Sequence, residues 1–283
     1  MKIDRFILIF SVLFSMLFIQ NRNAFSQVKI EGTVVEYNNR PVPYASIKLQ
    51  DHADGIVTDT SGNFLLHVRS LKPTDTLVIT SVGYEIFKIP AAKTLKKRSY
   101  QLTAYSKKMD AVVVKAFSKE DIAGAQTDKV GYYRGWNTDN RGGEIGRSIY
   151  VPHKEYQVSK VRFKIFTSCD TCTIRLHIRD IKSNGEPGRD LLDSNSNTVQ
   201  TFYNAAVADK TYDFDLLSRN IILHEKSIFV GFEVLKASSN GKDCSLSFVG
   251  SEPGVYIYKS DSWDNWNFTD YYTIHLKVFF RYD

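Results

Sequence analysis

The first candidates for chemistry are three cysteines, two of which form the motif Cys169-Asp-Thr-Cys172. A thioredoxin-like redox pair needs its first cysteine at a helix N-terminus, where the helix dipole lowers the thiol pKa. Residues 173–180 alternate as a strand does, and no second ligand pair for zinc accompanies the motif. We therefore expect a structural disulfide between Cys169 and Cys172 that leaves Cys244 free. The alternative is a disulfide from either of them to Cys244.

The histidines do not form a recognisable catalytic or metal-binding motif. None of the six stands in H-E-x-x-H or H-x-x-E, and no G-x-S-x-G or phosphate-loop motif is present. His177 and His275 alternate with apolar residues, so we expect both on solvated strand faces. The sequence therefore predicts no catalytic residue, metal or cofactor. A glycosidase carboxylate pair leaves no local sequence mark, which keeps a secreted hydrolase of polysaccharide or peptide as the alternative.

Aromatic residues are the strongest functional lead. One group crowds the segment 260–272, with sequence SDSWDNWNFTDYY, and a second group contains Tyr132, Tyr133 and Trp136. Exposed aromatic rings stack on the CH faces of sugars, while neighbouring Asp and Asn side chains bind hydroxyl groups. We predict a ligand platform for glycan; its members are Trp263, Trp266, Tyr271 and Trp136. In the alternative interpretation these rings close the ends of a hydrophobic core.

The elements that would position these residues are short strands. Apolar residues alternate over 28–34, 45–49 and 64–68, and residues 77–82 are apolar on both faces. Asn38-Asn39-Arg40-Pro41 and Asp59-Thr60-Ser61-Gly62-Asn63 provide turn residues between them. This pattern predicts a small β-sandwich in which residues 77–82 form a central strand covered on both sides.

The motifs of this stretch resemble a known domain family. They are GTVV at 32–35, RPVPYASI at 40–47, TDTSGNF at 58–64 and SVGYE at 81–85. Together they are similar to the carboxypeptidase regulatory-like domain, over about residues 28–104. The resemblance implies a seven-stranded, transthyretin-like sandwich of the type found at the N-terminus of surface proteins of Bacteroidota. It transfers no catalytic residue to this chain.

Alternation resumes after residue 128. It is clearest over 161–165, 174–178, 228–234 and 274–280, with turns between these runs and no long helical period. This predicts a second, jelly-roll-like β-sandwich. The domain resembles C-terminal β-sandwich domains of Bacteroidota surface proteins and, more distantly, carbohydrate-binding modules.

The N-terminus predicts export. Lys2 and Arg5 precede the apolar run 6–19, and Ala24 and Ser26 suit cleavage before Gln27. We expect a signal peptide over 1–26 and no membrane span after its removal. The protein would then lie in the periplasm, at the outer-membrane surface, or be secreted. The net charge of +6 includes a basic run at 93–98, which we interpret as a solvated loop and not as a nucleic-acid site.

Together these patterns predict the domain organisation of the chain and its general function. The chain is all-β, with a regulatory-like domain at 27–106, a linker at 107–127, and a jelly-roll-like domain at 128–283. Within the linker, residues 112–114 are a possible last or edge strand of the first domain. We expect a non-catalytic envelope or surface module whose partner is a surface glycan or an envelope protein. The oligomeric state leaves no sequence mark.

Overall fold

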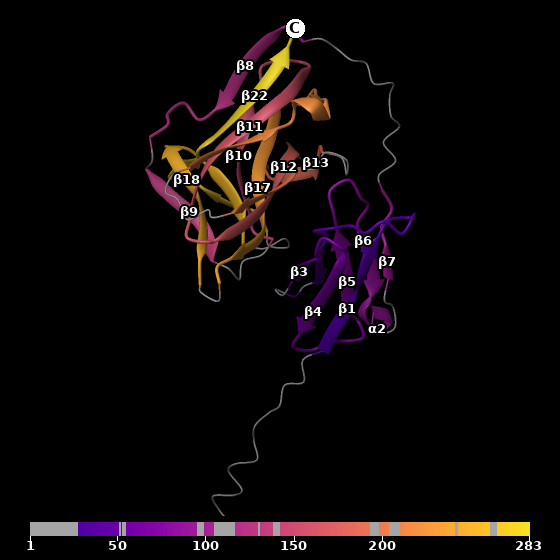
Figure 1. The fold of residues 1–283 in the computed structure, drawn as a ribbon. Helices are drawn as coiled ribbons and strands as arrows, with labels where there is room; N and C mark the ends of the chain where they lie inside the picture. The colour runs from indigo at the N-terminus through magenta and orange to yellow at the C-terminus, as the bar shows by residue number, and fades with distance from the viewer. Residues whose placement is uncertain are drawn as a thin grey trace, which may run out of the picture.

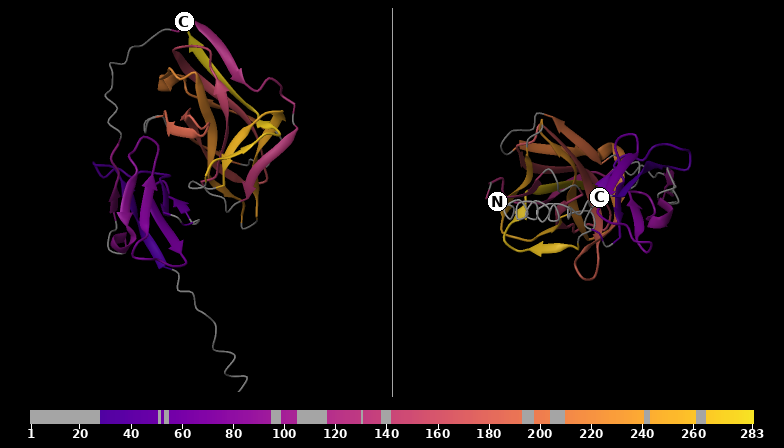
Figure 2. Two further views of the ribbon diagram at one scale, coloured as in Figure 1. Left: turned by 180° about the vertical axis from the view of Figure 1, so that it is seen from behind. Right: turned by 90° about the horizontal axis from the view of Figure 1, so that it is seen from below.

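The computed structural model describes residues 28–283 except 51, 53–54, 95–98, 105–116, 130, 138–141, 193–197, 204–209, 241–242 and 261–264. The predicted signal peptide, Trp263 and the possible edge strand at 112–114 lie outside these residues. In the described ranges the chain is almost entirely β, as predicted, and it forms the two side-by-side domains of Figure 1 and Figure 2. Within those ranges, no helix combines the length and the apolar character that crossing a membrane requires.

The first domain is the predicted seven-stranded sandwich. One sheet has the strand order β4-β1-β7 and the other has the order β3-β2-β5-β6. Its elements are β1 (Val28–Val35), β2 (Ser46–Leu49), β3 (Gly55–Val57), β4 (Asn63–Val68), β5 (Thr76–Thr80), β6 (Phe87–Pro90), α2 (Ala91–Thr94) and β7 (Ser99–Gln101). Side chains from both sheets interleave in one core that includes Ile30, Ile47, Leu66, Ile79 and Tyr100.

Turn chemistry follows the sequence in this domain. Gly62 has a φ of 76°, and a Cβ there would lie 2.5 Å from the Val34 carbonyl oxygen. The Asp59 carboxylate accepts hydrogen bonds from the backbone N–H groups of Ser61 and Asn63, each at 2.8 Å. The turn predicted here is therefore confirmed, with Gly62 in the left-handed conformation, and Val34 of β1 donates its N–H to the Gly62 carbonyl at 2.8 Å.

The second domain packs two larger sheets on each other. The first has the order β13-β12-β17-β10-β19-β20, with β14 added to β12. The second has the order β21-β18-β11-β22-β8, with β15 and β16 added to β11 and β9 to β18. Below, these are called the seven-stranded and the eight-stranded sheet.

The elements of this domain, in chain order, are β8 (Lys119–Gly124), β9 (Tyr132–Asn137), β10 (Glu144–Tyr150), β11 (Tyr156–Thr167), β12 (Thr171–Ile181), β13 (Pro187–Asp190), β14 (Val199–Tyr203), β15 (Lys210–Asp215), η1 (Leu217–Arg219), β16 (Ile221–Leu223), β17 (Ser227–Ser238), β18 (Ser245–Glu252), β19 (Tyr256–Lys259), β20 (Asn267–Thr269), β21 (Thr273–Ile274) and β22 (Leu276–Tyr282). The apolar positions of the four predicted alternating runs all lie in its core.

Strand β8 changes the expected domain boundary. It lies within the stretch predicted as a linker, yet it pairs antiparallel with β22 from Gly124↔Lys277 to Lys119↔Tyr282. The eight-stranded sheet therefore begins about ten residues before the expected start of the domain. The segment 119–124 carries three charged residues in six, which suits an exposed edge strand and hid it from an apolar pattern search.

The disulfide joins Cys169 to Cys244, with a Cα–Cα distance of 5.0 Å, and leaves Cys172 as a buried free thiol. The predicted Cys169–Cys172 pair is therefore wrong, and the alternative holds. The reason is strand register, because Thr167 pairs with Leu246 and Ser168 donates its N–H to the Ser245 carbonyl at 3.0 Å. One further step of the same ladder places Cys169 opposite Cys244, whereas Cys172 already belongs to β12 and faces the core.

This pairing predicts different effects for the two cysteines. The bond closes a loop with a sequence separation of 75 residues, so Cys244→Ala should lower the free energy of unfolding by about 2–5 kcal/mol. Cys172→Ala should cost less, about 1 kcal/mol, because it removes only one buried sulfur. Urea denaturation measures both variants, with non-reducing peptide mapping as the control. A larger loss for Cys172→Ala would contradict the assigned bond.

Candidate functional site

The predicted aromatic platform is not assembled as expected. Trp136 is only 8% exposed and packs edge-on against Phe248, with ring centroids 6.3 Å apart. It pairs with Leu246 across β9 and β18, and both side chains point into the core. The assignment of Trp136 to a ligand surface is therefore wrong. Tyr271, in contrast, is 77% exposed, as a platform residue must be.

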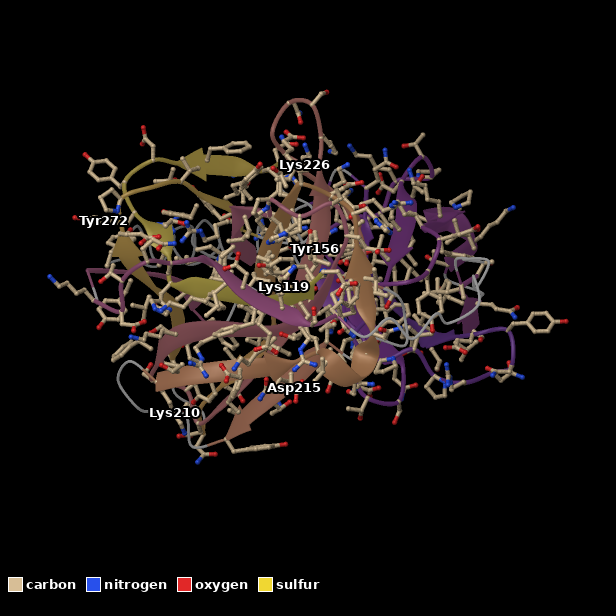
Figure 3. The ribbon with its side chains drawn as sticks, turned by 90° about the horizontal axis from the view of Figure 1, so that it is seen from above. Lys119, Tyr156, Lys210, Asp215, Lys226 and Tyr272 are labelled. Carbon is tan, nitrogen blue, oxygen red and sulfur yellow. A yellow bond between two sulfur atoms is a disulfide. The ribbon has the colours of Figure 1, made fainter. Side chains whose placement is uncertain are left out.

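The two aromatic groups of the sequence do meet in the structure, but through Tyr132 and Tyr272, which were not members of the predicted platform. Tyr132 and Tyr272 stack with ring centroids 5.9 Å apart and an interplanar angle of 17°, and they are 37% and 36% exposed. Between them lies Gly250, and a Cβ there would be 3.4 Å from the Cβ of each tyrosine. This tyrosine pair, with Tyr271 beside it in the chain, lies on the side of the second domain that faces away from the first domain (Figure 3).

Trp266 occupies a different place, on the outer face of the seven-stranded sheet. It is half-buried and packs edge-on against Phe229, with centroids 5.2 Å apart, and the Lys259 Nζ lies 4.8 Å from its ring. The Phe229 ring lies over Gly146 and Gly231, where an added Cβ would come within 2.4 and 2.5 Å of the ring. Two facing glycines thus make room for a buried aromatic ring on an outer face.

Next to this ring, charged side chains gather into one network, here called the ionic cluster. Its members are Glu144 on β10, Arg175, His177 and Arg179 on β12, Asp190 on β13, Glu233 on β17 and Lys259 on β19. Strand pairing brings them together: Glu144 is opposite Glu233 and Lys259, and Glu233 is also opposite Arg175. No sequence motif marks this set.

The carboxylates of the cluster are fully paired. Arg179 donates to both oxygens of Glu144 at 3.0 and 3.1 Å, and the Lys259 Nζ lies 3.2 Å from Oε2 of the same group. The Arg175 Nη1 donates to Glu233 Oε2 at 3.0 Å. Two-pronged guanidinium contacts of this kind fix geometry as well as charge.

His177 is the centre of the cluster and is buried, so the expectation of a solvated histidine is wrong. Its Nδ1 lies 2.5 Å from Asp190 Oδ2, and its Nε2 lies 3.0 Å from Glu233 Oε2. A ring with a carboxylate at each nitrogen is best satisfied as an imidazolium that donates to both. Burial alone would lower the pKa of His177, but the charges of Glu144 and Asp190 outweigh burial and raise it.

The glutamates respond in the opposite sense. Burial alone would raise the pKa of Glu233, but Arg175 and His177 outweigh it and lower that pKa to about 2. Burial alone would raise the pKa of Glu144 as well, but Arg179, His177 and Lys259 hold it well below its usual range. A glycosidase general acid needs a raised pKa at neutral pH. These two facing glutamates are therefore tuned to stay ionised and to hold cations.

The first domain covers the ionic cluster. The Ser46 hydroxyl donates to Glu233 Oε1 at 3.2 Å, and the Arg175 Nη2 donates to the Tyr44 carbonyl oxygen. Ser46 and Lys48 are buried although they point away from the core of their own domain, and Val82 packs against the core of the second. The outer face of β2 and β5 therefore meets the outer face of β12 and β17, which explains why residues 77–82 are apolar on both faces.

His275 is also buried, which corrects the second histidine expectation. Its Nε2 lies 2.8 Å from Asp128 Oδ1, and the Lys277 Nζ lies 3.1 Å from the same oxygen. Burial is the main reason that the pKa of His275 falls below its ordinary value, and the Asp128 hydrogen bond opposes it. Asp128 thus contacts His275 and Lys277 on the side of the chain opposite the core residues Ile274 and Leu276.

Two hollows flank the edge strand β8. One of about 330 Å³ lies between β8 and β10, and one of about 570 Å³ lies over β8, β11 and β22. Their carboxylates have local partners: Glu120 pairs with Arg281 at 2.7 Å, and Asp121 accepts the Ile122 N–H at 2.8 Å. Neither hollow is lined by a member of the ionic cluster, and the described residues hold no group of three or more potential metal ligands.

Comparison with known proteins bears on the first domain. Residues 30–114 match the family model of the CarboxypepD_reg-like domain. This match supports the resemblance drawn from the GTVV, RPVPYASI and TDTSGNF motifs. It covers less than half of the chain and ends before β8, so it assigns nothing to the second domain.

No curated protein matches the chain in sequence. Two solved structures of low similarity are a chain of infectious bursal disease virus Gx strain and BcpA, the major pilin subunit of Bacillus cereus. The viral chain is 12% identical with a TM-score of 0.27, over 90% of this chain and 62% of its own. BcpA is 9% identical with a TM-score of 0.19, over 88% of this chain and 69% of its own. This chain thus spans about three fifths of the viral protein, and these TM-scores support no inference from either structure.

The packing of the Phe229 ring on Gly146 and Gly231 gives a prediction about stability. A Cβ on Gly146 would lie 2.3 Å from the Val230 carbonyl oxygen as well as against the Phe229 ring. Gly146→Ala should therefore lower the free energy of unfolding by about 1–3 kcal/mol. Gly131→Ala is the control, because its nearest neighbour would be 3.7 Å away. Urea denaturation of both variants would contradict the packing if their losses were equal.

The two buried histidines predict a stability maximum near pH 6.5. The pKa of His177 is raised from 6.5, so its contribution is complete below 6.5 and is lost as the pH rises through the raised value. The pKa of His275 is lowered from 6.5, so its contribution is complete above 6.5 and is lost as the pH falls through the lowered value.

Urea denaturation between about pH 5 and pH 9 tests this expectation. Above pH 6.5 the free energy of unfolding should fall by at most about 1.4 kcal/mol per pH unit. His177→Gln should remove this alkaline decline and keep the acid one. An alkaline decline of the same slope in His177→Gln would assign the effect to another group.

Proposed function

We propose that this chain is an exported, non-catalytic binding module of the cell envelope or surface, in which the second domain binds carbohydrate. One observation carries the proposal: the stacked Tyr132–Tyr272 pair, with exposed Tyr271 next to it in the chain. Large exposed aromatic groups are unusual on a soluble surface and suit ligands with flat apolar faces. The proposed tyrosine platform keeps Tyr271 from the set expected from sequence and adds Tyr132 and Tyr272.

The arrangement of the domains supports a binding role. The tyrosine platform lies on the side that faces away from the first domain (Figure 3), so a ligand can reach it while the domains stay in contact. The first domain then serves as a spacer or docking unit. The exported location is part of the proposal and rests on the signal-like N-terminus and the disulfide, which forms in oxidising compartments.

The hydrolase alternative has one feature in its favour, since His177 lies among carboxylates as a catalytic base can. However, both its nitrogens already have carboxylate partners, and the first domain covers the cluster. The lowered pKa values of Glu144 and Glu233 also remove the general acid that glycoside cleavage needs. The geometry therefore favours binding over hydrolysis.

A glycan array probed with the full chain tests the proposal. Tyr132→Ala combined with Tyr272→Ala should reduce binding to any recognised glycan by tenfold or more, since each lost aromatic contact is worth about 0.5–1.5 kcal/mol beyond its buried area. Tyr203→Ala is the matched control, because Tyr203 is an exposed tyrosine of the same domain. Binding to no glycan, or equal loss in the control, would sink the tyrosine platform.

A further inference from the structure

We propose that the tyrosine platform binds an acidic glycan, and that Arg134 binds the carboxylate of a uronic acid residue of this glycan. The inference rests on the proposed function, because it names the class of sugar that the Tyr132–Tyr272 pair holds. Three observations on Arg134 lead to it: its place beside the pair, the partners of its guanidinium group, and the access of water to its nitrogens.

Arg134 follows Tyr132 on the same face of β9. Alternate residues of a strand share a face, and their Cα atoms are about 7 Å apart. Strand pairing places Tyr132 opposite Gly250 and Arg134 opposite Phe248 on β18. Burial increases along this face, from Tyr132 at 37% exposed, through the half-buried Arg134, to the buried Trp136. The guanidinium group is therefore at the inner end of the tyrosine platform.

The guanidinium group of Arg134 has an aromatic neighbour. Its Cζ lies 4.8 Å from the centroid of the Tyr258 ring on β19. Tyr256 is also near, since burial raises the pKa of its hydroxyl and the charge of Arg134 opposes that rise. A cation–π contact of this kind holds the guanidinium group in place but gives it no anionic partner.

No carboxylate forms an ion pair with Arg134 among the residues that the structure describes, and none of them accepts a hydrogen bond from its side chain. The more buried arginines of this domain differ in that respect. Arg147, Arg175 and Arg179 each have a glutamate oxygen at 3.0 Å, as charge removed from water requires. Arg134 is thus a half-buried cation whose anionic partner must come from outside the described chain.

Water reaches the guanidinium nitrogens of Arg134. They are absent from the fully buried side-chain atoms that lack a hydrogen-bond partner, a set that does include the Arg147 Nε. A guanidinium group carries five N–H donors and stays protonated at every physiological pH. The donors of Arg134 are therefore charged, accessible to solvent and available to a ligand that lies on the tyrosine pair.

A uronic acid residue matches both parts of this site. Its pyranose ring provides the CH face that stacks on tyrosine, and its carboxylate projects from the edge of that ring. Guanidinium groups bind carboxylates through two parallel hydrogen bonds, which adds geometric specificity to the attraction of charge. A neutral sugar would use the tyrosines alone and leave Arg134 to water, so the site should prefer the acidic form.

Paired oligosaccharides test the proposal on the full chain. A glycan array carries oligosaccharides that contain uronic acid, each beside its carboxyl-reduced, neutral form. The parent chain should bind at least one acidic form about tenfold more tightly than its neutral partner, because only the acidic form makes charge-assisted hydrogen bonds to Arg134. Added salt should weaken binding of the acidic form and leave the neutral form unchanged.

Arg134→Gln removes the charge and should abolish the preference for the acidic form, while the neutral form binds as it does to the parent chain. Arg219→Gln is the matched control, because Arg219 is an exposed arginine of the same domain on η1, and it should keep the preference. If Arg134→Gln fails to fold by circular dichroism, Arg134→Lys replaces it. This variant should reduce the preference severalfold, because an ammonium group cannot form the two parallel hydrogen bonds.

The outcomes separate this inference from the proposed function. Equal binding of acidic and neutral forms, with both lost in Tyr132→Ala combined with Tyr272→Ala, overturns the role of Arg134 and keeps the tyrosine platform. A preference that persists in the Arg134 variant, or that falls equally in Arg219→Gln, also overturns the role of Arg134. Binding of neither form of any pair overturns both.

Discussion

The outer face of the seven-stranded sheet buries ion pairs, and the rest of the structure is arranged to make that burial possible. Charge removed from water must be paired and hydrogen-bonded, or it costs several kcal/mol per group. Strand register meets this requirement by placing Glu144 opposite Lys259 and Glu233 opposite Arg175. His177 then bridges Glu233 to Asp190 and links the two halves of the network.

The same face explains how the domains are joined. A sheet face of charged residues would ordinarily be solvated, yet here it meets the outer face of β2 and β5 of the first domain. Ser46 and the Tyr44 carbonyl provide the two polar groups that match Glu233 and Arg175, while Val82 provides apolar contact. The junction is therefore specific in geometry, since each of these hydrogen bonds joins a defined group of one domain to a defined group of the other.

The tyrosine platform and the junction lie in separate parts of the second domain. Tyr132 lies on β9 and Tyr272 directly precedes β21, on either side of Gly250 and at the side that faces away from the first domain. Trp266 belongs instead to the margin of the ionic cluster, against Phe229. A single aromatic segment in the sequence is thus divided by the fold between the exposed Tyr271 and Tyr272 and the half-buried Trp266 beside Phe229.

The sequence by itself determined the fold class, the first domain and most of the core. Period-two alternation marks which face of a strand is buried, and the Asp59–Asn63 turn carries its own backbone hydrogen bonds, so both are local properties. The charged strand β8 was missed as a strand because its pairing with β22 is not encoded in an apolar pattern.

Only the tertiary structure decided the rest. His177 was expected on a solvated face because nothing in its own strand shows that β13 and β17 supply its carboxylate partners and that another domain covers them. The disulfide depended on the register of β11 and β18, and the tyrosine platform depended on two segments about 140 residues apart that flank Gly250. Each of these is a contact between distant segments, whose partners a local pattern cannot name.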